Sequence, residues 1–132
     1  MKQTLFPEFP VLVVDDEKNF LNSIDFELRS HGITHVECCR DSRNVMALLK
    51  SKKYSVILLD ILMPHITGDE LLPQIVEAFP ELPVIVVTAF PDKETSINCM
   101  KKGAFDCHTK PIDTKELIRT IRNALELKGI RL

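Results

Sequence analysis

The sequence lacks several features that would assign it to a specialised class of protein. Its formal net charge is only −2 over 132 residues, so it offers no basic field that would attract nucleic acid. No apolar run is long enough to span a bilayer, and the amino terminus has no hydrophobic signal-peptide segment. We therefore expect no direct contact with nucleic acid, no membrane partner, and a cytoplasmic location.

The four cysteines exclude further classes. Cys38, Cys39, Cys99 and Cys107 form no Cys-x-x-Cys pair, and their spacing matches no zinc site. Free thiols in a reducing compartment are expected. The chain also has no repeat, low-complexity tract or internal linker, and 132 residues suffice for one domain but not for two. We expect a single domain over residues 1–132, with its core at about 10–128.

Short apolar runs are what the sequence does contain. Residues 56–59 are four uninterrupted aliphatic side chains that lead into Asp60, a pattern typical of a strand buried on both faces of a parallel sheet. A second run, Val11–Val14, leads into Asp15 and Asp16. Three further strands are predicted at residues 33–38, 82–88 and 105–109.

Helical patterns separate these strands. Phe20, Ile24 and Leu28 recur every four residues and predict a helix that ends at Gly32. Four more helices are predicted: one around residues 45–49 capped by Asp41 or Ser42, and others opening at 67–70, over 92–102, and from 114 to about 128. Residues 1–9 are expected to be an extended leader. This alternation predicts an α/β fold with a five-stranded parallel sheet and helices on both faces.

Polar side chains end these strands: Asp15 and Asp16 the first, Asp60 the third, Thr88 the fourth and Lys110 the fifth. In a flavodoxin-like, doubly wound sheet of order 2-1-3-4-5, the first and third strands are neighbours, so the three carboxylates would converge. Such a cluster calls for a divalent cation, and hard oxygen ligands select Mg²⁺ or Mn²⁺. A carboxylate beside that ion can attack a phosphoryl group, whose oxygens Lys110 and Thr88 can contact.

Each of these residues also has an ordinary structural explanation. Asp60 could cap the following turn and Asp16 the first helix, Thr88 could bond to the backbone, and Lys110 could be a solvated surface side chain. Singly, these explanations are as good as the functional ones. Together they require five coincidences at one edge of one sheet, which favours a functional site.

From about residue 10 to 128 the chain resembles the response-regulator receiver domain of two-component signalling. On this resemblance Asp60 is the phosphoacceptor, Asp16 the principal ligand of Mg²⁺ and Asp15 an assisting ligand, and Leu62 contributes its backbone carbonyl. The resemblance implies a signalling module rather than a conventional enzyme. Its partner would be a sensor histidine kinase or a phosphotransfer protein, from whose phosphohistidine it catalyses its own phosphorylation.

The same resemblance implies roles for the remaining residues. Thr88 is the switch hydroxyl, and Lys110 contacts the phosphoryl group and precedes a proline whose peptide bond the family usually holds cis. Residues 79–85 and 103–106 resemble the receivers of AAA+ enhancer-binding transcription activators. That likeness implies an effector outside this chain, regulation of transcription, and a homodimer through the fourth helix, fifth strand and last helix. Leu62 and Phe90 flank the path of water to the phosphoryl group and, being apolar, imply slow dephosphorylation.

Two residues depart from the family pattern. Cys107 stands where the family has Tyr or Phe, and a thiol cannot act as the rotating aromatic of the output switch. His108 follows it, where an aliphatic residue is usual. A receiver that binds without responding to phosphate is one alternative. The others are a haloacid-dehalogenase-like phosphatase, disfavoured because Asp15 and Asp16 are adjacent rather than Asp-x-Asp, and a flavodoxin, disfavoured because no phosphate loop follows the first strand.

Overall fold

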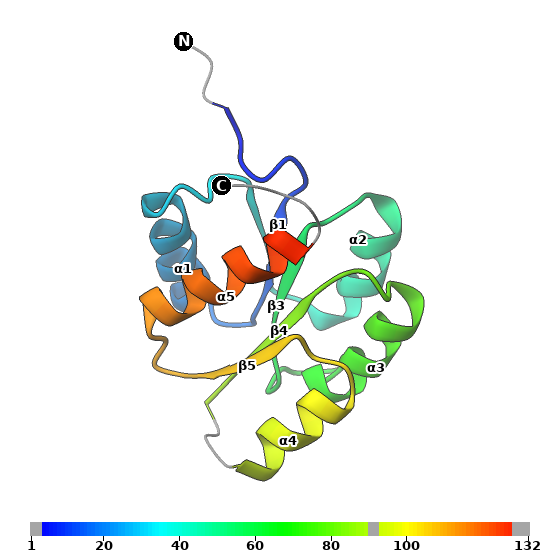
Figure 1. Cartoon of the computed structure of the whole chain (residues 1–132). Coiled ribbons are helices and arrows are strands. Elements are labelled where there is room, and N and C mark those ends of the chain that lie inside the picture. Colours follow the sequence, from blue (N-terminus) through cyan, green and yellow to red (C-terminus); the bar gives the residue numbers. More distant parts are fainter. Residues whose placement is uncertain (1–3, 90–92, 128–132) are drawn as a thin grey trace.

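The computed structural model describes residues 4–89 and 93–127, through which five strands alternate with helices (Figure 1). The strands are β1 (Val11–Val14), β2 (Val36–Cys39), β3 (Val56–Asp60), β4 (Val84–Thr88) and β5 (Asp106–Thr109). The helices are α1 (Lys18–Ser30), α2 (Val45–Ser51), α3 (Gly68–Ala78), α4 (Lys93–Lys101) and α5 (Thr114–Leu127), with the 3₁₀ helix η1 (Ser42–Asn44) before α2. All strands are parallel in the order β2-β1-β3-β4-β5, which confirms the predicted fold class.

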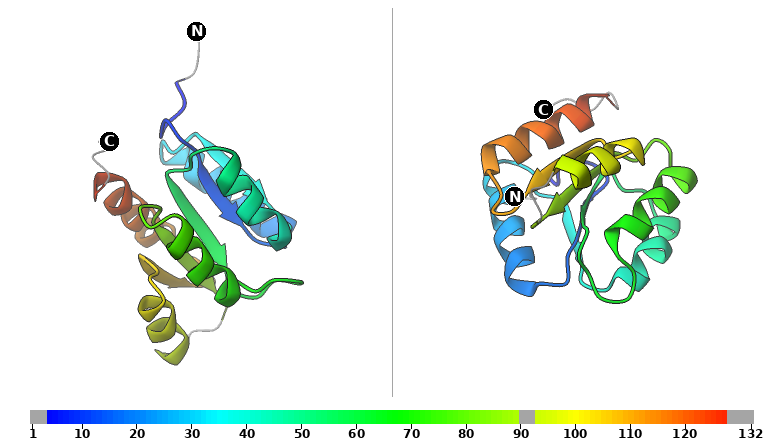
Figure 2. Two further views of the ribbon diagram at one scale, coloured as in Figure 1. Left: turned by 90° about the vertical axis from the view of Figure 1, so that its right-hand side faces the viewer. Right: turned by 90° about the horizontal axis from the view of Figure 1, so that it is seen from below.

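The three inner strands are buried on both faces, as their apolar runs predict. Successive side chains of a strand point to opposite faces. Leu12 and Ile57 accordingly pack with residues of α2 and α3, whereas Val13 and Leu58 pack with residues of α1 and α5. The right-hand view of Figure 2 shows these two helix pairs on opposite sides of the sheet. This double cover leaves the carboxyl ends of the strands as the place where polar side chains can gather.

Helix α1 ends at Ser30, with Gly32 just beyond it as predicted. Gly32 has φ +87°, and its N–H donates to the Arg29 carbonyl at 3.1 Å, while the Ile33 N–H donates to the Leu28 carbonyl at 2.9 Å. These two bonds form a Schellman motif, in which glycine takes the left-handed position. Ile33 is therefore the buried residue that closes the helix, and the strand predicted from residue 33 begins only at Val36.

Other element boundaries also differ from the prediction. The Leu82 N–H donates to the Phe79 carbonyl in a turn, so β4 begins at Val84 rather than at 82. Strand β5 begins at Asp106, one residue later than predicted. The predicted start of the fourth helix at Asp92 and the predicted end of the last helix at Lys128 lie outside the described residues.

The described part of the segment before β1, residues 4–10, is not the extended leader that the sequence suggested. Residues 6–9 form bends, and the Phe6 carbonyl accepts hydrogen bonds from the Thr34 and His35 N–H groups at 2.7 and 2.9 Å. The Phe6 side chain packs against the α1 and α5 side of the core. The segment is bent because it is anchored to the loop before β2.

Two predictions, the lack of a membrane-spanning helix and the free state of the cysteines, concern residues that the structure describes. None of their helices has both the length and the apolar character needed to cross a bilayer. All four cysteines lie in the described part of the chain and are free thiols, as predicted.

Candidate functional site

Three carboxylates meet where β1 and β3 end. Since the two strands are adjacent and parallel, with Val14 opposite Leu59, the residues that follow emerge side by side. Asp15, Asp16 and Asp60 each place a carboxylate oxygen within 4.8 Å of the others. Asp15 and Asp60 are buried and Asp16 is half-buried. The structure thus brings together the three acids singled out from the sequence.

Lys110 is the cation beside this cluster. Its Nζ lies 2.6 Å from Asp15 Oδ2 and 3.8 Å from Asp60 Oδ2. The same ammonium lies 4.1 Å from the centroid of the Phe20 ring, a cation–π contact. Lys110 is therefore held by Phe20 of α1 and by Asp15 just after β1, although it follows the end of β5 in the sequence.

Thr88 lies at the end of β4, next to β3, and is buried. Its carbonyl accepts a hydrogen bond from the Lys110 N–H at 2.8 Å, which joins the ends of β4 and β5. The Lys110–Pro111 peptide bond is cis, as the resemblance implies. Thr88 and Lys110 therefore lie at the same edge of the sheet as the three acids.

The electrostatics of the cluster favour a divalent cation. Burial and then the charge of Asp15 raise the pKa of Asp60 to about 6, against the lowering effect of Lys110 and of a hydrogen bond from the Leu62 N–H. One ammonium faces three carboxylates, so negative charge remains in excess. Carboxylate oxygens are the ligands that Mg²⁺ and Mn²⁺ prefer, and the residues present fit such an ion.

The ordinary structural explanations account for these acids only in part. Glu17, not Asp16, occupies the N-cap position of α1, and it makes no side-chain cap hydrogen bond. The Asp15 Oδ1 atom accepts from the Glu17 N–H at 2.9 Å, and the Asp60 carboxylate accepts from the Leu62 N–H. These turn bonds orient Asp15 and Asp60 without taking either out of the cluster.

Two residues that shape the site are not identified as such from the sequence. Phe20, assigned to the apolar face of α1, is half-buried and packs against the core beneath α1, and its ring also contacts Lys110. Gly68 lies so near the end of β3 that an added Cβ would be 2.2 Å from the Asp60 carbonyl oxygen, and its N–H donates to the Ile61 carbonyl at 2.8 Å. A glycine in the first turn of a helix is the one signal that pointed to this close approach.

The two departures from the family pattern lie on β5. The half-buried Cys107 thiol interacts with Ser96 and Cys99 of α4, and burial raises the pKa of the Cys107 thiol. The His108 Nε2 atom lies 2.9 Å from Thr120 Oγ1 of α5. Strand β5 is thus linked to both neighbouring helices by sulfur and polar contacts. Phe90, predicted to flank the site with Leu62, lies outside the described residues.

Comparison with known proteins gives a consistent set of relatives. The family model described as the response regulator receiver domain matches residues 11–122. The regulatory protein AtoC of Escherichia coli (strain K12) is 32% identical over 122 residues, which cover 92% of this chain and 26% of AtoC. The DNA-binding transcriptional regulator NtrC of Salmonella typhimurium is 36% identical over 115 residues, 87% of this chain and 24% of NtrC. The chain spans about a quarter of the length of these curated relatives.

Solved structures share the fold. The receiver domain of the Francisella response regulator 1452 aligns with a TM-score of 0.85 and 29% identity, covering 92% of this chain and 99% of that one. The beryllofluoride-activated NtrC4 receiver domain dimer aligns with a TM-score of 0.83 and 32% identity, covering 89% and 97%. The matches to NtrC and AtoC confirm the predicted resemblance to receivers of AAA+ enhancer-binding activators. With the family model matched along most of its length, the chain belongs to the response regulator receiver domains, which are signalling modules.

Proposed function

We propose that this chain is a single receiver domain over residues 1–132, with its core at about 10–128, that takes a phosphoryl group onto Asp60. The donor is the phosphohistidine of a sensor histidine kinase or a phosphotransfer protein. The observation that carries the proposal is the meeting of Asp15, Asp16 and Asp60 within 4.8 Å, with the Lys110 ammonium beside them. No other arrangement of acids and a lysine in the described residues matches this family's reaction so directly.

Asp60 is the nucleophile of the proposed reaction. One of its carboxylate oxygens attacks phosphorus, the bond from phosphorus to the donor imidazole nitrogen breaks, and the electron pair stays on that nitrogen. A pKa of about 6 leaves the Asp60 carboxylate largely ionised at pH 7 and above, which the attack requires. The Leu62 N–H, which bonds to this carboxylate, helps to fix its orientation.

Asp15, Asp16, Asp60 and the Leu62 backbone carbonyl would hold Mg²⁺, for which Mn²⁺ could substitute. When bound, the ion supplies positive charge that offsets the carboxylates and the phosphoryl oxygens. Lys110 provides a second positive charge, and it already lies 3.8 Å from an Asp60 oxygen. The Thr88 hydroxyl donates to another phosphoryl oxygen, which couples the modification to β4.

The experiment is intact-mass measurement after incubation with acetyl phosphate, with and without Mg²⁺. We expect one added phosphoryl group in the presence of Mg²⁺ and none in Asp60→Asn. Asp25→Asn is the matched control, since Asp25 is a surface acid of α1 that pairs with Arg29 at 3.0 Å. It should be labelled like the unsubstituted protein. Full labelling of Asp60→Asn would refute Asp60 as the acceptor.

The output of this receiver is proposed to be regulation of transcription in the cytoplasm. The supporting observation is that its relatives include the DNA-binding transcriptional regulator NtrC, of which this chain matches about a quarter. Direct contact with DNA would then belong to an effector outside the sequence considered, since the net charge of −2 offers no basic field. The control of such an effector requires a surface that changes on phosphorylation.

That surface is proposed to be α4, β5 and α5, through which phosphorylation favours a homodimer. Ile97 and Met100 of α4 are 52% and 47% exposed, so they place two apolar side chains on the surface of an otherwise polar helix. The beryllofluoride-activated NtrC4 receiver, a related structure, is a dimer. Because residue 107 is a cysteine whose thiol interacts with Ser96 and Cys99 of α4, β5 would signal to α4 through this contact and not through an aromatic side chain.

Sedimentation with and without beryllofluoride and Mg²⁺ tests this assembly. We expect dimer formation with beryllofluoride, weakened by Ile97→Asp but not by Phe26→Asp. Phe26 is the matched control because it is also an exposed apolar side chain, but on α1, which is not one of the three elements of this surface. A monomer in both conditions at high concentration would contradict the proposal and would favour a receiver that does not dimerise.

A further inference from the structure

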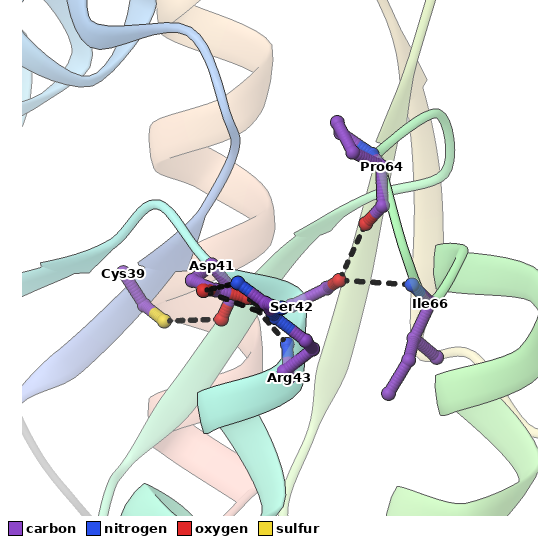
Figure 3. Close-up of polar contacts among 6 residues, drawn as sticks. All are labelled: Cys39, Asp41, Ser42, Arg43, Pro64 and Ile66. Atoms are coloured by element: carbon purple, nitrogen blue, oxygen red, sulfur yellow. Dashed lines mark hydrogen bonds and ion pairs between the residues drawn. The ribbon is translucent and has the colours of Figure 1, made fainter.

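Ser42 has a buried hydroxyl that the proposed function does not yet use. The residue is 2% exposed and begins η1, just after β2. Its hydroxyl donates to the Pro64 carbonyl at 2.8 Å and accepts from the Ile66 N–H at 3.1 Å, as Figure 3 shows. The cap of η1 is made instead by Asp41, whose carboxylate accepts from the Arg43 N–H. Ser42 is therefore free of the capping task and joins η1 to the loop that follows Asp60.

That loop has an uncommon backbone at the point of contact. His65 has φ +72°, a left-handed conformation that residues other than glycine rarely adopt. The Ile66 N–H also donates to the Pro64 carbonyl at 3.0 Å. An i to i+2 bond around a residue of positive φ belongs to the strained kind of γ-turn. Ser42 donates to the carbonyl and accepts from the N–H of this same turn, so one side chain holds both of its ends.

The turn lies two residues beyond Leu62. The Leu62 side chain is 50% exposed, so packing does not fix this residue, although its N–H bonds to the Asp60 carboxylate. Its neighbours Ile61 and Met63 are buried. The main chain at Leu62 is thus held between the end of β3 on one side and the Ser42 contact at Pro64 on the other.

We propose that Ser42 is a positioning residue for phosphoryl transfer, whose hydroxyl holds the Pro64–Ile66 turn and so keeps the Leu62 main chain in place to orient Asp60 and to bind Mg²⁺. This role rests on the proposed function. Ser42 touches neither the phosphoryl group nor the ion, and it acts only through the loop.

The test compares Mg²⁺ binding by Ser42→Ala and Ser55→Ala in calorimetric titrations. Ser55 is the matched control, because it is also buried and its hydroxyl donates to a proline carbonyl, that of Pro10 at 3.3 Å, before the sheet begins. Ser42→Ala removes both hydrogen bonds of this hydroxyl and should raise the Mg²⁺ Kd about fivefold, whereas Ser55→Ala should leave it unchanged. Labelling by acetyl phosphate should slow by at least the same factor at limiting Mg²⁺, and saturating Mg²⁺ should restore the part of the rate that is lost to weaker metal binding. Amide exchange at Ile66 should quicken in Ser42→Ala alone.

The results for Ser42→Ala and for the unsubstituted protein together decide whether Ser42 has this positioning role. A lowered melting temperature with an unchanged Mg²⁺ Kd means that Ser42 is merely structural and overturns the proposal. If Ser42→Ala does not fold, the isosteric pair Ser42→Thr and Ser42→Val isolates the hydroxyl, and equal Kd values for the two overturn it. If the unsubstituted protein neither binds Mg²⁺ nor is labelled, the proposed function fails and this role with it. If that protein reacts while Ser42→Ala binds Mg²⁺ equally well, only the role of Ser42 fails.

Discussion

Replacement of Gly68 by alanine tests how closely α3 is docked against the end of β3. The added Cβ would lie 2.2 Å from the Asp60 carbonyl oxygen and 2.8 Å from the Ile61 Cα atom. Both are main-chain atoms, so no rotation of a side chain can relieve the overlap. Overpacking of this kind costs roughly 1–3 kcal/mol, and the better helix propensity of alanine returns at most about 1 kcal/mol. Because the clash is with backbone, the cost should be near the upper end, and we expect a net loss of about 2 kcal/mol in the free energy of unfolding.

Urea denaturation followed by far-ultraviolet circular dichroism is the suitable assay, since the chain has no tryptophan and only one tyrosine. In a thermal melt the same loss corresponds to a fall of roughly 6–10 °C for a domain of this size. Gly32→Ala is the control, because Gly32 has φ +87° but no atom within 4 Å of an added Cβ. Gly32→Ala should lower the free energy of unfolding only by the cost of holding alanine in a left-handed conformation, about 1 kcal/mol. If Gly68→Ala is as stable as the unsubstituted protein, or costs less than Gly32→Ala, the close approach is not the constraint inferred here.

Three further predictions concern the acid cluster. In the folded state the pKa of Asp60 is raised to about 6, so the unsubstituted protein loses stability as the pH rises from about 4 to 6 and this carboxyl ionises. In metal-free buffer Asp60→Asn removes that ionisation and should raise the free energy of unfolding at pH 7–8 by up to about 3 kcal/mol. The gain should vanish near pH 4, and equal gains in urea midpoints at pH 4 and pH 7.5 would contradict this. Asp16→Ala should weaken Mg²⁺ binding by roughly tenfold or more in calorimetry, and an unchanged Kd would rule it out as a ligand. Leu62→Asn combined with Phe90→Glu should speed loss of the phosphoryl group roughly tenfold, about 1.4 kcal/mol of barrier, because polar side chains can admit and orient water. An unchanged decay rate would refute the idea that Leu62 and Phe90 obstruct the path of water.

The sheet and its acids are predictable from the sequence because both depend on local pattern. An unbroken aliphatic run such as residues 56–59 can be buried only where both faces of a strand are covered, and β3 is covered on both. Once the strands are parallel and the first and third are neighbours, Asp15 and Asp60 must emerge side by side. Their meeting follows from topology alone, without knowledge of any side-chain contact.

What the sequence does not reveal depends on contacts between distant segments. Phe20 fits a four-residue period, but the structure buries Leu21 and leaves Phe20 at the edge of that face, where Lys110 from β5 meets it. The sequence predicts Ser42 as a possible helix cap, but its hydroxyl forms hydrogen bonds with Pro64 and Ile66, more than twenty residues away. Only the folded arrangement of β2, β3 and their loops decides between those uses.

The two edge strands carry a consequence for how this protein can assemble. Strands β2 and β5 have four residues each, and both hold a charged residue: Glu37, which accepts from the Tyr54 hydroxyl at 2.9 Å, and Asp106, which accepts from the Thr120 hydroxyl at 3.1 Å. Short edges that carry charge discourage the pairing of a strand from another molecule. Two copies that meet through α4, β5 and α5 would therefore associate through side chains and not by pairing of strands, and such a contact can form and separate without breaking a main-chain hydrogen bond in either copy.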